Sequence, residues 1–338
     1  MADCRLVDTQ QRRDRPRLLA DNRDRRGPLP VGSDSCRTDG PSHVNYLEEP
    51  ICFDCAAEAL LGILARPEQV AELGVLVVVG GPQTRVGSHR QFVLLSRRLA
   101  AAGYASLRFD YRGMGDSTGE QHDFENIEAD IGAAIGVFQG ACPAVKRVVL
   151  WGLCDAAAAS LLYWDSTRDQ RIFGFCLLNP WVRSEETLAR TQVKHYYGQR
   201  LLQKQFWTKL FRGQLDILAA LRELFSKMKL ASARSKSVGL QTICFQDRMA
   251  RTVATSQLPI LLILSGNDYT AKEFLEYTAS ARSWQGTLDT PRLKRIDIAG
   301  ADHTFSSHVL RDRVADECVE WLDEQIRSLR ADNDHHRR

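Results

Sequence analysis

The chain has 338 residues, enough to bury a large core, and its 44% hydrophobic and 26% charged residues are typical of a globular protein. No apolar run approaches the roughly 18 residues of a membrane-spanning helix, and the N-terminus lacks the apolar segment of a signal peptide. Nine irregularly spaced cysteines and a net charge of +3 do not fit a disulfide-stapled secreted scaffold, so we expect a cytoplasmic protein.

Residues 1–43 differ from the rest of the chain. They contain nine Arg and seven Asp, with Pro and Gly and hardly any apolar periodicity. Such a segment cannot bury enough apolar surface to offset the entropy lost on ordering, which predicts a disordered tail. The arginines could also form an RNA-binding arm. Because acidic residues nearly balance them and no aromatic residues are interleaved, we expect no nucleic-acid partner.

Beyond the tail, the sequence predicts strands that alternate with helices. Two early antiparallel strands are expected, and Ser88 is expected to cap a helix whose apolar face contains Phe92, Leu95 and Leu99. Helical crossovers between strands require parallel pairing. The chain therefore predicts an α/β fold, a mostly parallel twisted sheet of about eight strands with helices on both faces. The strands are expected at 51–53, 59–64, 75–79, 105–109, 147–151, 172–178, 260–264 and 293–298, with a further helix at 127–138.

Some eighty residues without a strand pattern separate the sixth and seventh predicted strands, which is more than a crossover needs. We expect residues 184–256 to form a helical cap, inserted in a core made of residues 44–183 and 257–331. The cap has thirteen Lys or Arg against five Asp or Glu, a net charge of +8. This charge is either a solvated basic face or a surface that steers an anionic substrate toward the cleft.

The segment 148–157, VVLWGLCDAA, places a cysteine at a sharp corner between a strand and a helix. A β-favouring run leads into Gly152, and the alanines after Asp155 allow the helix to pack closely on the strand. This pattern is typical of a nucleophile elbow, which would expose Cys154 above the sheet beside N–H groups that stabilise an oxyanion. The alternative is an ordinary turn with a buried cysteine.

Two later segments add an acid and an imidazole. Asp268 follows the buried strand at 260–264, and His303 lies in the loop after the strand at 293–298. Parallel strands end at one edge of a sheet, so both residues are expected at the same edge as Cys154. Taken singly, Asp268 is also explained as a turn residue and His303 as a residue of a helix-start loop.

The chain resembles an α/β-hydrolase, because its nucleophile, acid and histidine come in the order of that family. Further similarity lies in the segments GGPQ at 80–83, FDYRGMGDS at 109–117, GLCDAA at 152–157, NPWVR at 179–183 and DHTF at 302–305. With these segments the chain resembles, more narrowly, the exosortase A system-associated hydrolase 1 group over about residues 45–330. That resemblance implies a bacterial protein encoded near exopolysaccharide and protein-sorting genes.

The resemblance implies a catalytic triad of Cys154, Asp268 and His303. Cysteine instead of serine at the elbow is similar to dienelactone hydrolase. A thiol with an ordinary pKa of about 8.5 needs His303 to activate it, and Asp268 to hold the imidazole tautomer. One oxyanion donor is expected from the backbone of Asp155. Pro82 has no N–H, so the other comes from Gly81 or Gln83, and we favour Gln83.

The remaining candidates are weaker. Arg85, His89 and Arg90 flank the oxyanion segment and either bind an anion of the substrate or serve solubility only. Cys52 and Cys55 resemble half a zinc site, but no second pair is present and a strand points the two thiols to opposite faces. We therefore expect no metal and no cofactor.

Three functions fit these residues. The first is hydrolysis of an ester, thioester or lactone through an acyl-enzyme on Cys154, acting on a small-molecule or lipid-linked acyl substrate. The second is acyl transfer to a surface-polysaccharide precursor, since thioacyl intermediates also react with amines and alcohols. The third is a binding or scaffold protein that keeps the fold without catalysis.

Overall fold

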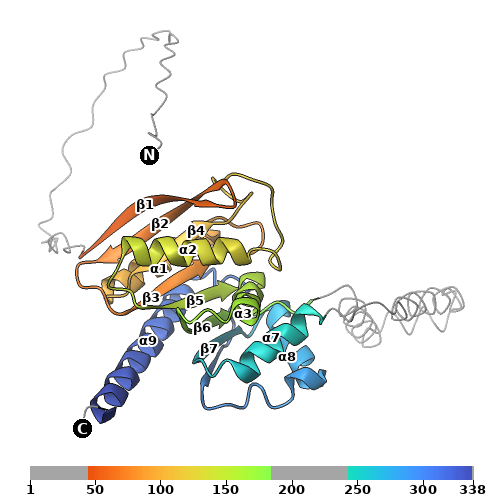
Figure 1. The fold of residues 1–338 in the computed structure, drawn as a ribbon. Helices are drawn as coiled ribbons and strands as arrows, with labels where there is room; N and C mark the ends of the chain where they lie inside the picture. Colours follow the sequence, from red (N-terminus) through yellow and green to blue (C-terminus); the bar gives the residue numbers. More distant parts are fainter. Residues whose placement is uncertain (1–44, 184–242, 337–338) are drawn as a thin grey trace, which may run out of the picture. The chain divides into compact units, whose positions relative to one another are not determined.

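A computed structural model describes residues 45–183 and 243–336 of the chain (Figure 1). The predicted tail at 1–43 and residues 184–242 of the predicted cap lie outside the described residues. Within them, eight strands form one mostly parallel sheet in the order β1-β2-β4-β3-β5-β6-β7-β8. The predicted α/β fold and strand number are confirmed. The strands are β1 (Tyr46–Cys55), β2 (Glu58–Pro67), β3 (Leu73–Val78), β4 (Ser106–Asp110), β5 (Arg147–Leu153), β6 (Ile172–Leu178), β7 (Ile260–Ser265) and β8 (Leu293–Ile298).

The sheet begins with an antiparallel hairpin. β1 and β2 pair along their whole length, and β2 also pairs antiparallel with β4, whereas all later neighbours are parallel. Two residues, Ala56 and Ala57, form the turn with φ of 49° and 67°. These left-handed conformations match the right twist of the strands but cost energy in a residue other than glycine. Both strands are longer than predicted, because pairing in the sheet extends them beyond their apolar centres.

Helices cover both faces of the sheet. Of the helices in the described residues, four pack on one face and two on the other, and the two layers flank the sheet in Figure 1. Strand β5 shows why two cores form, because Val148 and Leu150 face the first group while Val149 and Trp151 face the second. The first group comprises α2 (Glu128–Ala141), α3 (Asp155–Thr167), α7 (Phe245–Thr255) and α8 (Tyr269–Ser280), and the second comprises α1 (Gln91–Ala101) and α9 (His308–His336).

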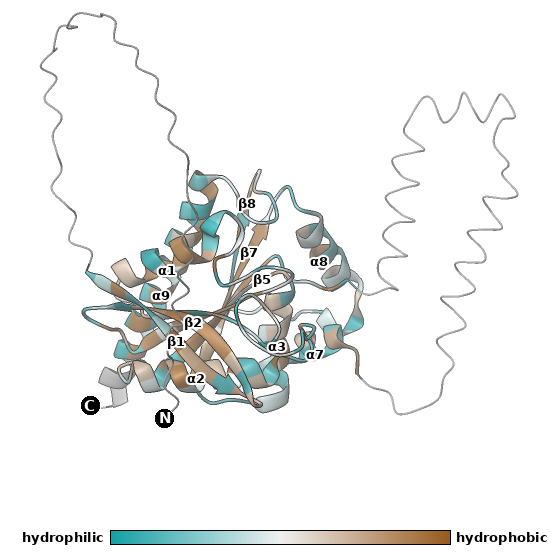
Figure 2. Ribbon diagram, turned by 90° about the horizontal axis from the view of Figure 1, so that it is seen from above, coloured by the Kyte–Doolittle hydropathy of each residue, from teal (hydrophilic) through white to brown (hydrophobic). Residues whose placement is uncertain are grey.

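The hydropathy of the strands and helices follows from the position of the sheet between two layers of helices. In Figure 2 the central strands are coloured as apolar, whereas the helices carry both apolar and hydrophilic colours. Strands buried on both faces need continuous apolar runs, and β3, β6 and β7 are buried at every position. Helix α7 falls within the range predicted for the cap, and it packs against α3.

The start of α1 differs from the prediction. A short 3₁₀ turn, η1 (Ser88–Arg90), precedes the helix, and the residue that caps α1 is Arg90, in a left-handed conformation with φ of 61°. The expected cap by Ser88 is therefore wrong. The side chain of Ser88 makes no capping bond, because Gly87, at φ 73°, and Gln83 set the path of the chain at this point.

The sheet topology determines where a site can form. β4 lies on one side of β3 and β5 lies on the other, so the strand order reverses direction between β3 and β5. The loops that follow two such strands separate and leave a crevice at the carboxyl edge of the sheet. The loop from Val79 to Gly81 and the corner at Cys154 lie at this position, because Val78 pairs with Gly152.

Candidate active site

Cys154 forms the corner between β5 and α3. Its backbone has φ of 63° and ψ of −123°, a conformation that costs about 1–3 kcal/mol in a residue other than glycine. The corner is tight because Gly152 has no side chain. A Cβ at Gly152 would lie 2.5 Å from the carbonyl of Ala156. The strained corner predicted from the segment 148–157 is present.

Backbone hydrogen bonds hold the corner in place. The N–H of Cys154 donates to the carbonyl of Leu178 at 2.8 Å, and the carbonyl of Cys154 accepts from the N–H of Trp181 at 3.1 Å. The neighbouring strand β6 and the segment after it therefore brace the residue from both sides. This bracing stabilises a strained backbone that the local sequence alone would not retain.

Asp268 and His303 meet at the same edge of the sheet. Oδ2 of Asp268 lies 2.9 Å from Nδ1 of His303. The same carboxylate caps α8 by accepting from the N–H groups of Thr270 at 3.2 Å and Ala271 at 3.1 Å. Burial raises the pKa of Asp268, but the hydrogen bond and charge of His303 and the two N–H groups outweigh burial and leave it below its usual range.

A second pair of residues positions the loop of His303. Nδ2 of Asn179 donates to the backbone carbonyl of His303 at 3.1 Å and to Oγ of Ser265 at 2.8 Å. Oδ1 of Asn179 accepts from the N–H of Ser265, whose hydroxyl donates to the carbonyl of Asp302. Asn179 is fully buried, with φ of 43°. Our site prediction missed this network, although an Asn-Pro pair directly after a buried strand is a detectable signal.

The thiol of Cys154 is neutral in this structure. Burial, and after it the carboxylate of Asp155, raise the pKa of Cys154 to about 12. Among the described residues, no hydrogen bond joins its sulfur to the ring of His303. Cys154 packs against the same apolar cluster to which Ala301 and Phe305 belong, residues that lie two positions before and two positions after the histidine. The structure thus contains no preformed thiolate and imidazolium pair.

Both candidates for the first oxyanion donor make hydrogen bonds in the structure. The N–H of Gly81 donates to Oδ2 of Asp155 at 2.8 Å. The side chain of Gln83 turns away toward α1, where its Oε1 accepts from the N–H of Ser88 and from Nε2 of Gln91, both at 3.2 Å. Of the two alternatives, Gly81 rather than Gln83 is the residue that contacts the elbow.

The carboxyl group of Asp155 is the least expected feature of the site. Its Oδ1 is buried and, within the part of the chain that the structure describes, has no hydrogen-bond partner. Burial raises the pKa of Asp155, while the N–H groups of Gly81, Ala156 and Asp155 itself and the charge of His303 lower it in part. Sequence reasoning assigned only the backbone of this residue to the site.

Arg85, one of the three residues expected either to bind an anion or to serve solubility only, is paired with two carboxylates in the structure. Its guanidinium pairs with the buried carboxylate of Asp110 and lies 2.6 Å from Asp116 through Nη2. Its N–H also donates to Asp110 at 2.5 Å. His89 and Arg90 are exposed at the start of α1, both with left-handed backbones. His89 lies near enough to the loop of His303 to lower the pKa of Asp302, after the larger effect of the Ser306 hydrogen bond.

The turn after β4 is braced by hydrogen bonds of its polar residues. Arg112 donates to the buried carboxylate of Asp130 through Nε at 2.9 Å and Nη2 at 2.8 Å. The hydroxyl of Ser117 donates to the carbonyl of Asp110 and accepts from the N–H of Leu61. These hydrogen bonds account for the polar residues of the 109–117 segment, which therefore need no catalytic role.

Arg183 is the last residue described before the gap at 184–242. It donates to Oε2 of Glu273 through Nε at 2.9 Å and Nη2 at 2.6 Å, and it stacks on the ring of Trp181 at 4.7 Å. Burial and the carboxylate of Asp155 raise the pKa of Cys154, and the positive charge of Arg183 lowers it by a smaller amount. Arg183 is therefore a cation close to the thiol, although Glu273 offsets its charge.

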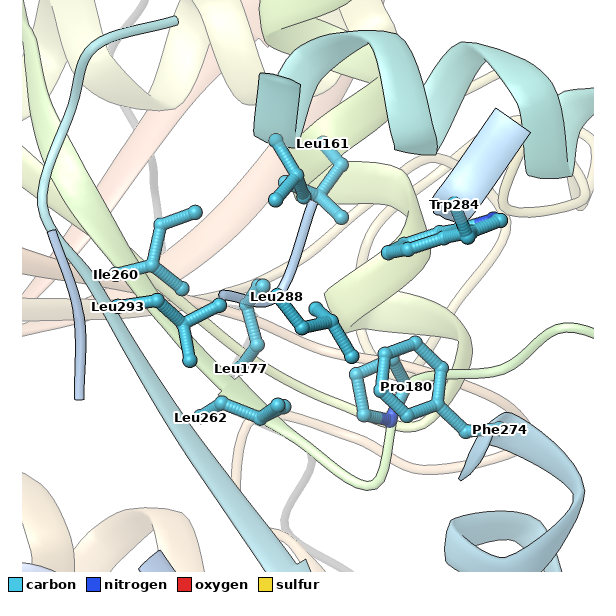
Figure 3. A pocket seen from close by; sticks show the side chains of 10 residues that line it. Leu161, Leu177, Pro180, Ile260, Leu262, Phe274, Trp284, Leu288 and Leu293 are labelled. Atoms are coloured by element: carbon cyan, nitrogen blue, oxygen red, sulfur yellow. The ribbon is translucent and has the colours of Figure 1, made fainter. Parts of the chain in front are cut away.

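An apolar cavity of ≈ 10 Å³ lies beside the sheet, between β6, β7, α3 and the segment that carries Trp284 (Figure 3). A cavity of this size is about the minimum that holds one water molecule, and its lining offers no polar group to bind one. It does not reach the residues described above. We regard it as a packing defect of the core. The lining residues are Leu161, Leu177, Pro180, Val253, Ile260, Leu262, Phe274, Trp284, Leu288 and Leu293.

The described residues offer neither a metal-binding cluster nor a membrane-spanning helix. They contain no group of three or more His, Cys, Asp or Glu side chains placed to hold a metal ion. None of the helices at 45–183 and 243–336 combines the length and the apolar character needed to cross a bilayer. Cys52 is exposed and Cys55 is buried on β1, so the two thiols do not face one another.

Known proteins share this architecture. A family model described as "Alpha/beta hydrolase family" matches residues 75–317, more than half of the chain. A comparison with curated proteins finds no match. Among solved structures, the esterase Pf2001 of Pyrococcus furiosus aligns with a TM-score of 0.55 at 16% identity, covering 83% of this chain and 94% of that one.

Two further structures are similar to the same degree. Est1E of Butyrivibrio proteoclasticus, solved with ferulic acid bound, gives a TM-score of 0.52 at 16% identity and covers 82% of this chain and 99% of its own. Dienelactone hydrolase from Anabaena variabilis gives 0.52 at 14% identity and covers 83% and 98%. At these identities the likeness is one of fold.

Proposed function

The chain belongs to the alpha/beta hydrolase family, and we propose that it is an esterase-like hydrolase that uses Cys154 as its nucleophile, His303 as general base and Asp268 as the residue that orients His303. The observation that carries this proposal is the 2.9 Å contact between Asp268 and His303 at the sheet edge where the strained Cys154 corner lies. A carboxylate on Nδ1 leaves Nε2 free to exchange a proton with the nucleophile.

The raised pKa of Cys154 determines how the reaction begins. A thiol with a pKa of about 12 is protonated at neutral pH, so its proton passes to Nε2 of His303 as the sulfur attacks the carbonyl carbon. The C–S bond forms, and the carbonyl π electrons move onto oxygen. When the carbonyl re-forms, the bond to the leaving alcohol or thiol breaks and the imidazolium returns the proton to it. Water then attacks the thioester by the same sequence and frees Cys154.

The substrate is proposed from the sequence. An ester, thioester or lactone fits a cysteine nucleophile, and the charge of residues 184–256 favours an anionic acyl group, either on a small molecule or linked to a lipid. The resemblance to the exosortase A system-associated group favours a role in exopolysaccharide chemistry. The odd number and irregular spacing of the nine cysteines favour a cytoplasmic location.

Trapping an acyl-enzyme tests the proposal. The full chain would be mixed with p-nitrophenyl acetate, p-nitrophenyl butyrate and acyl-CoA thioesters, quenched in acid and analysed by intact and peptide mass spectrometry. We expect one acyl group on the peptide that contains Cys154, which is absent in Cys154→Ala. The control Cys52→Ala removes an exposed thiol and should leave the adduct unchanged. Acylation that follows Cys52, or no acylation of any substrate, would contradict the proposal.

The acyltransferase and the binding protein, the two alternatives, predict different results in the same experiment. An acyltransferase would lose its acyl group faster when an amine or a sugar alcohol is added, and a hydrolase would not. One observation favours a binding protein: the carboxylate of Asp155 already accepts the N–H of Gly81 that an oxyanion would need. A binding protein would show no adduct on Cys154.

A further inference from the structure

The carboxyl group of Asp155 occupies the space in which the proposed reaction would develop its negative charge. Oδ2 accepts from Gly81 at 2.8 Å, and Oδ1 lies against the backbone, where a Cβ on Gly80 would be only 2.1 Å away. Glycine at position 80 therefore leaves room for this carboxyl group. The N–H groups that lower its pKa, those of Gly81, Ala156 and Asp155 itself, belong to the two segments that form an oxyanion hole in the proposed mechanism.

An ionised Asp155 opposes acyl transfer in two ways. It competes with the carbonyl oxygen of the substrate for the N–H of Gly81. It also places a negative charge beside an oxygen that becomes negative in the transition state, and like charges repel most strongly where water is excluded. The neutral carboxylic acid removes this repulsion and supplies an O–H donor in addition.

Burial raises the pKa of Asp155 and so shifts its ionisation toward the neutral form, although the N–H groups of the surrounding backbone and the charge of His303 act in the opposite direction. The groups that face Asp155 are Tyr111 after β4, Cys154 at the elbow and His303 from the loop after β8. Burial, together with the charge of Asp155, raises the pKa of Tyr111 to about 12, so the phenol is neutral. Cys154 is neutral as well. His303 is the one group of these three that becomes a cation, and its Nδ1 is already paired with Asp268.

We propose that Asp155 acts in the proposed acyl transfer as a neutral carboxylic acid that donates its O–H to the carbonyl oxygen of the substrate, and that its ionised form closes the oxyanion hole. The inference rests on the proposed function and adds a second catalytic carboxyl group to it. The proton stays on Asp155 throughout. Its hydrogen bond to the substrate oxygen strengthens as that oxygen gains charge and weakens when the carbonyl re-forms, so no oxidant or further reactant is needed.

The proposal predicts a falling alkaline limb in the rate of acylation. Single-turnover acylation of the full chain by p-nitrophenyl acetate would be measured from about pH 5 to 9 in the wild type, Asp155→Asn and Asp155→Ala. An amide cannot ionise and keeps a donor, and alanine frees the N–H of Gly81. We expect both variants to lose the falling limb, with Asp155→Asn at least about tenfold faster than the wild type at the alkaline end. The exposed carboxylate of Asp312 provides a control, and Asp312→Asn should keep the limb.

A second measurement detects the protonation of Asp155 without catalysis. The ¹H–¹⁵N signal of Gly81 should titrate with the same midpoint as the falling limb, and this titration should be absent in Asp155→Asn. A falling limb that persists in both Asp155 variants would overturn the role of Asp155 and leave the proposed function intact. No acylation in the wild type or any variant would overturn the proposed function, and with it this role, even if Gly81 titrates.

Discussion

The carboxylate of Asp268 binds the ring of His303 at 2.9 Å and at the same time caps helix α8. One side chain thus connects the end of β7, the loop after β8 and the start of a helix. Because the cap holds the carboxylate in one position, the imidazole that binds it is held as well. The two roles can be separated by mutation.

Asp268→Asn should reduce activity without a large loss of stability. Asparagine caps a helix about as well as aspartate, but it cannot stabilise the imidazolium or enforce the tautomer. We expect kcat to fall by roughly 10³-fold or more. Asp268→Ala should lose as much activity and, in addition, about 1 kcal/mol of unfolding free energy from the cap. Steady-state kinetics and urea unfolding separate the two, and equal stability losses would contradict the assignment of the cap.

The pKa of Asp268 also predicts a pH dependence of stability. Its pKa in the folded chain is lowered, so the carboxylate contributes stability above its ordinary pKa in the unfolded chain, and this contribution is lost as the pH falls through the lowered value. Thermal unfolding should therefore show the wild type losing its advantage over Asp268→Ala as the solution is acidified. An advantage that grows on acidification would have the wrong sign.

Asp155→Asn should show the opposite trend. Burial raises the pKa of Asp155, so ionisation of this group destabilises the folded chain as the pH rises through the raised value. We expect Asp155→Asn to unfold at a higher temperature than the wild type near pH 8, with a smaller difference near pH 5. Calorimetry at the two pH values measures this.

The rate of alkylation should show that the thiol of Cys154 at the elbow is neutral. At pH 8 a pKa of about 12 leaves roughly one Cys154 in 10⁴ ionised, so iodoacetamide should label the exposed Cys52 first. Asp155 is the second largest cause of the raised pKa, and Asp155→Asn should accelerate labelling of Cys154 but not of Cys52. Peptide mass mapping over time gives both rates. Labelling of Cys154 ahead of Cys52 in the wild type would show that the thiol is activated.

Asn179→Asp should weaken catalysis through the position of His303. The substitution keeps the oxygen that accepts from Ser265 and removes the donor to the carbonyl of His303. A displaced imidazole lowers kcat, with KM affected less, and we expect a loss of about 10–10²-fold. Ser265→Ala removes the other bond to this loop and should act in the same direction. An unchanged kcat in both variants would show that the network only supports the fold.

Arg112→Met should be among the more destabilising substitutions away from the site. It leaves the fully buried carboxylate of Asp130 without its partner, which costs about 3–5 kcal/mol. The matched control is Arg98→Met, because Arg98 pairs with Asp316 at the surface and half of its side chain is exposed. Exposed pairs contribute at most about 1 kcal/mol. Urea unfolding of the two variants measures the difference.

Local patterns were sufficient to predict the layout of this protein. Apolar runs of strand length, glycine and alanine at one corner, and polar residues directly after buried strands placed Cys154, Asp268 and His303 at one edge of the sheet. These inferences succeed because each depends on neighbouring residues, and because parallel strands must end together. The cap of α1 by Ser88 was predicted from the same kind of pattern and is wrong, because a turn held by Gln83 intervenes.

Only the tertiary structure determines which groups lie together at the crevice. The bond from Gly81 to Asp155 joins residues 74 positions apart, and that from Asn179 to His303 joins residues 124 apart. Such contacts depend on how β3, β5, β6 and the loop after β8 approach each other, and no local pattern encodes that distance. The same approach buries much of the elbow, which raises the pKa values of Cys154 and Asp155, and it brings His303 to Asp268, whose pKa is lowered.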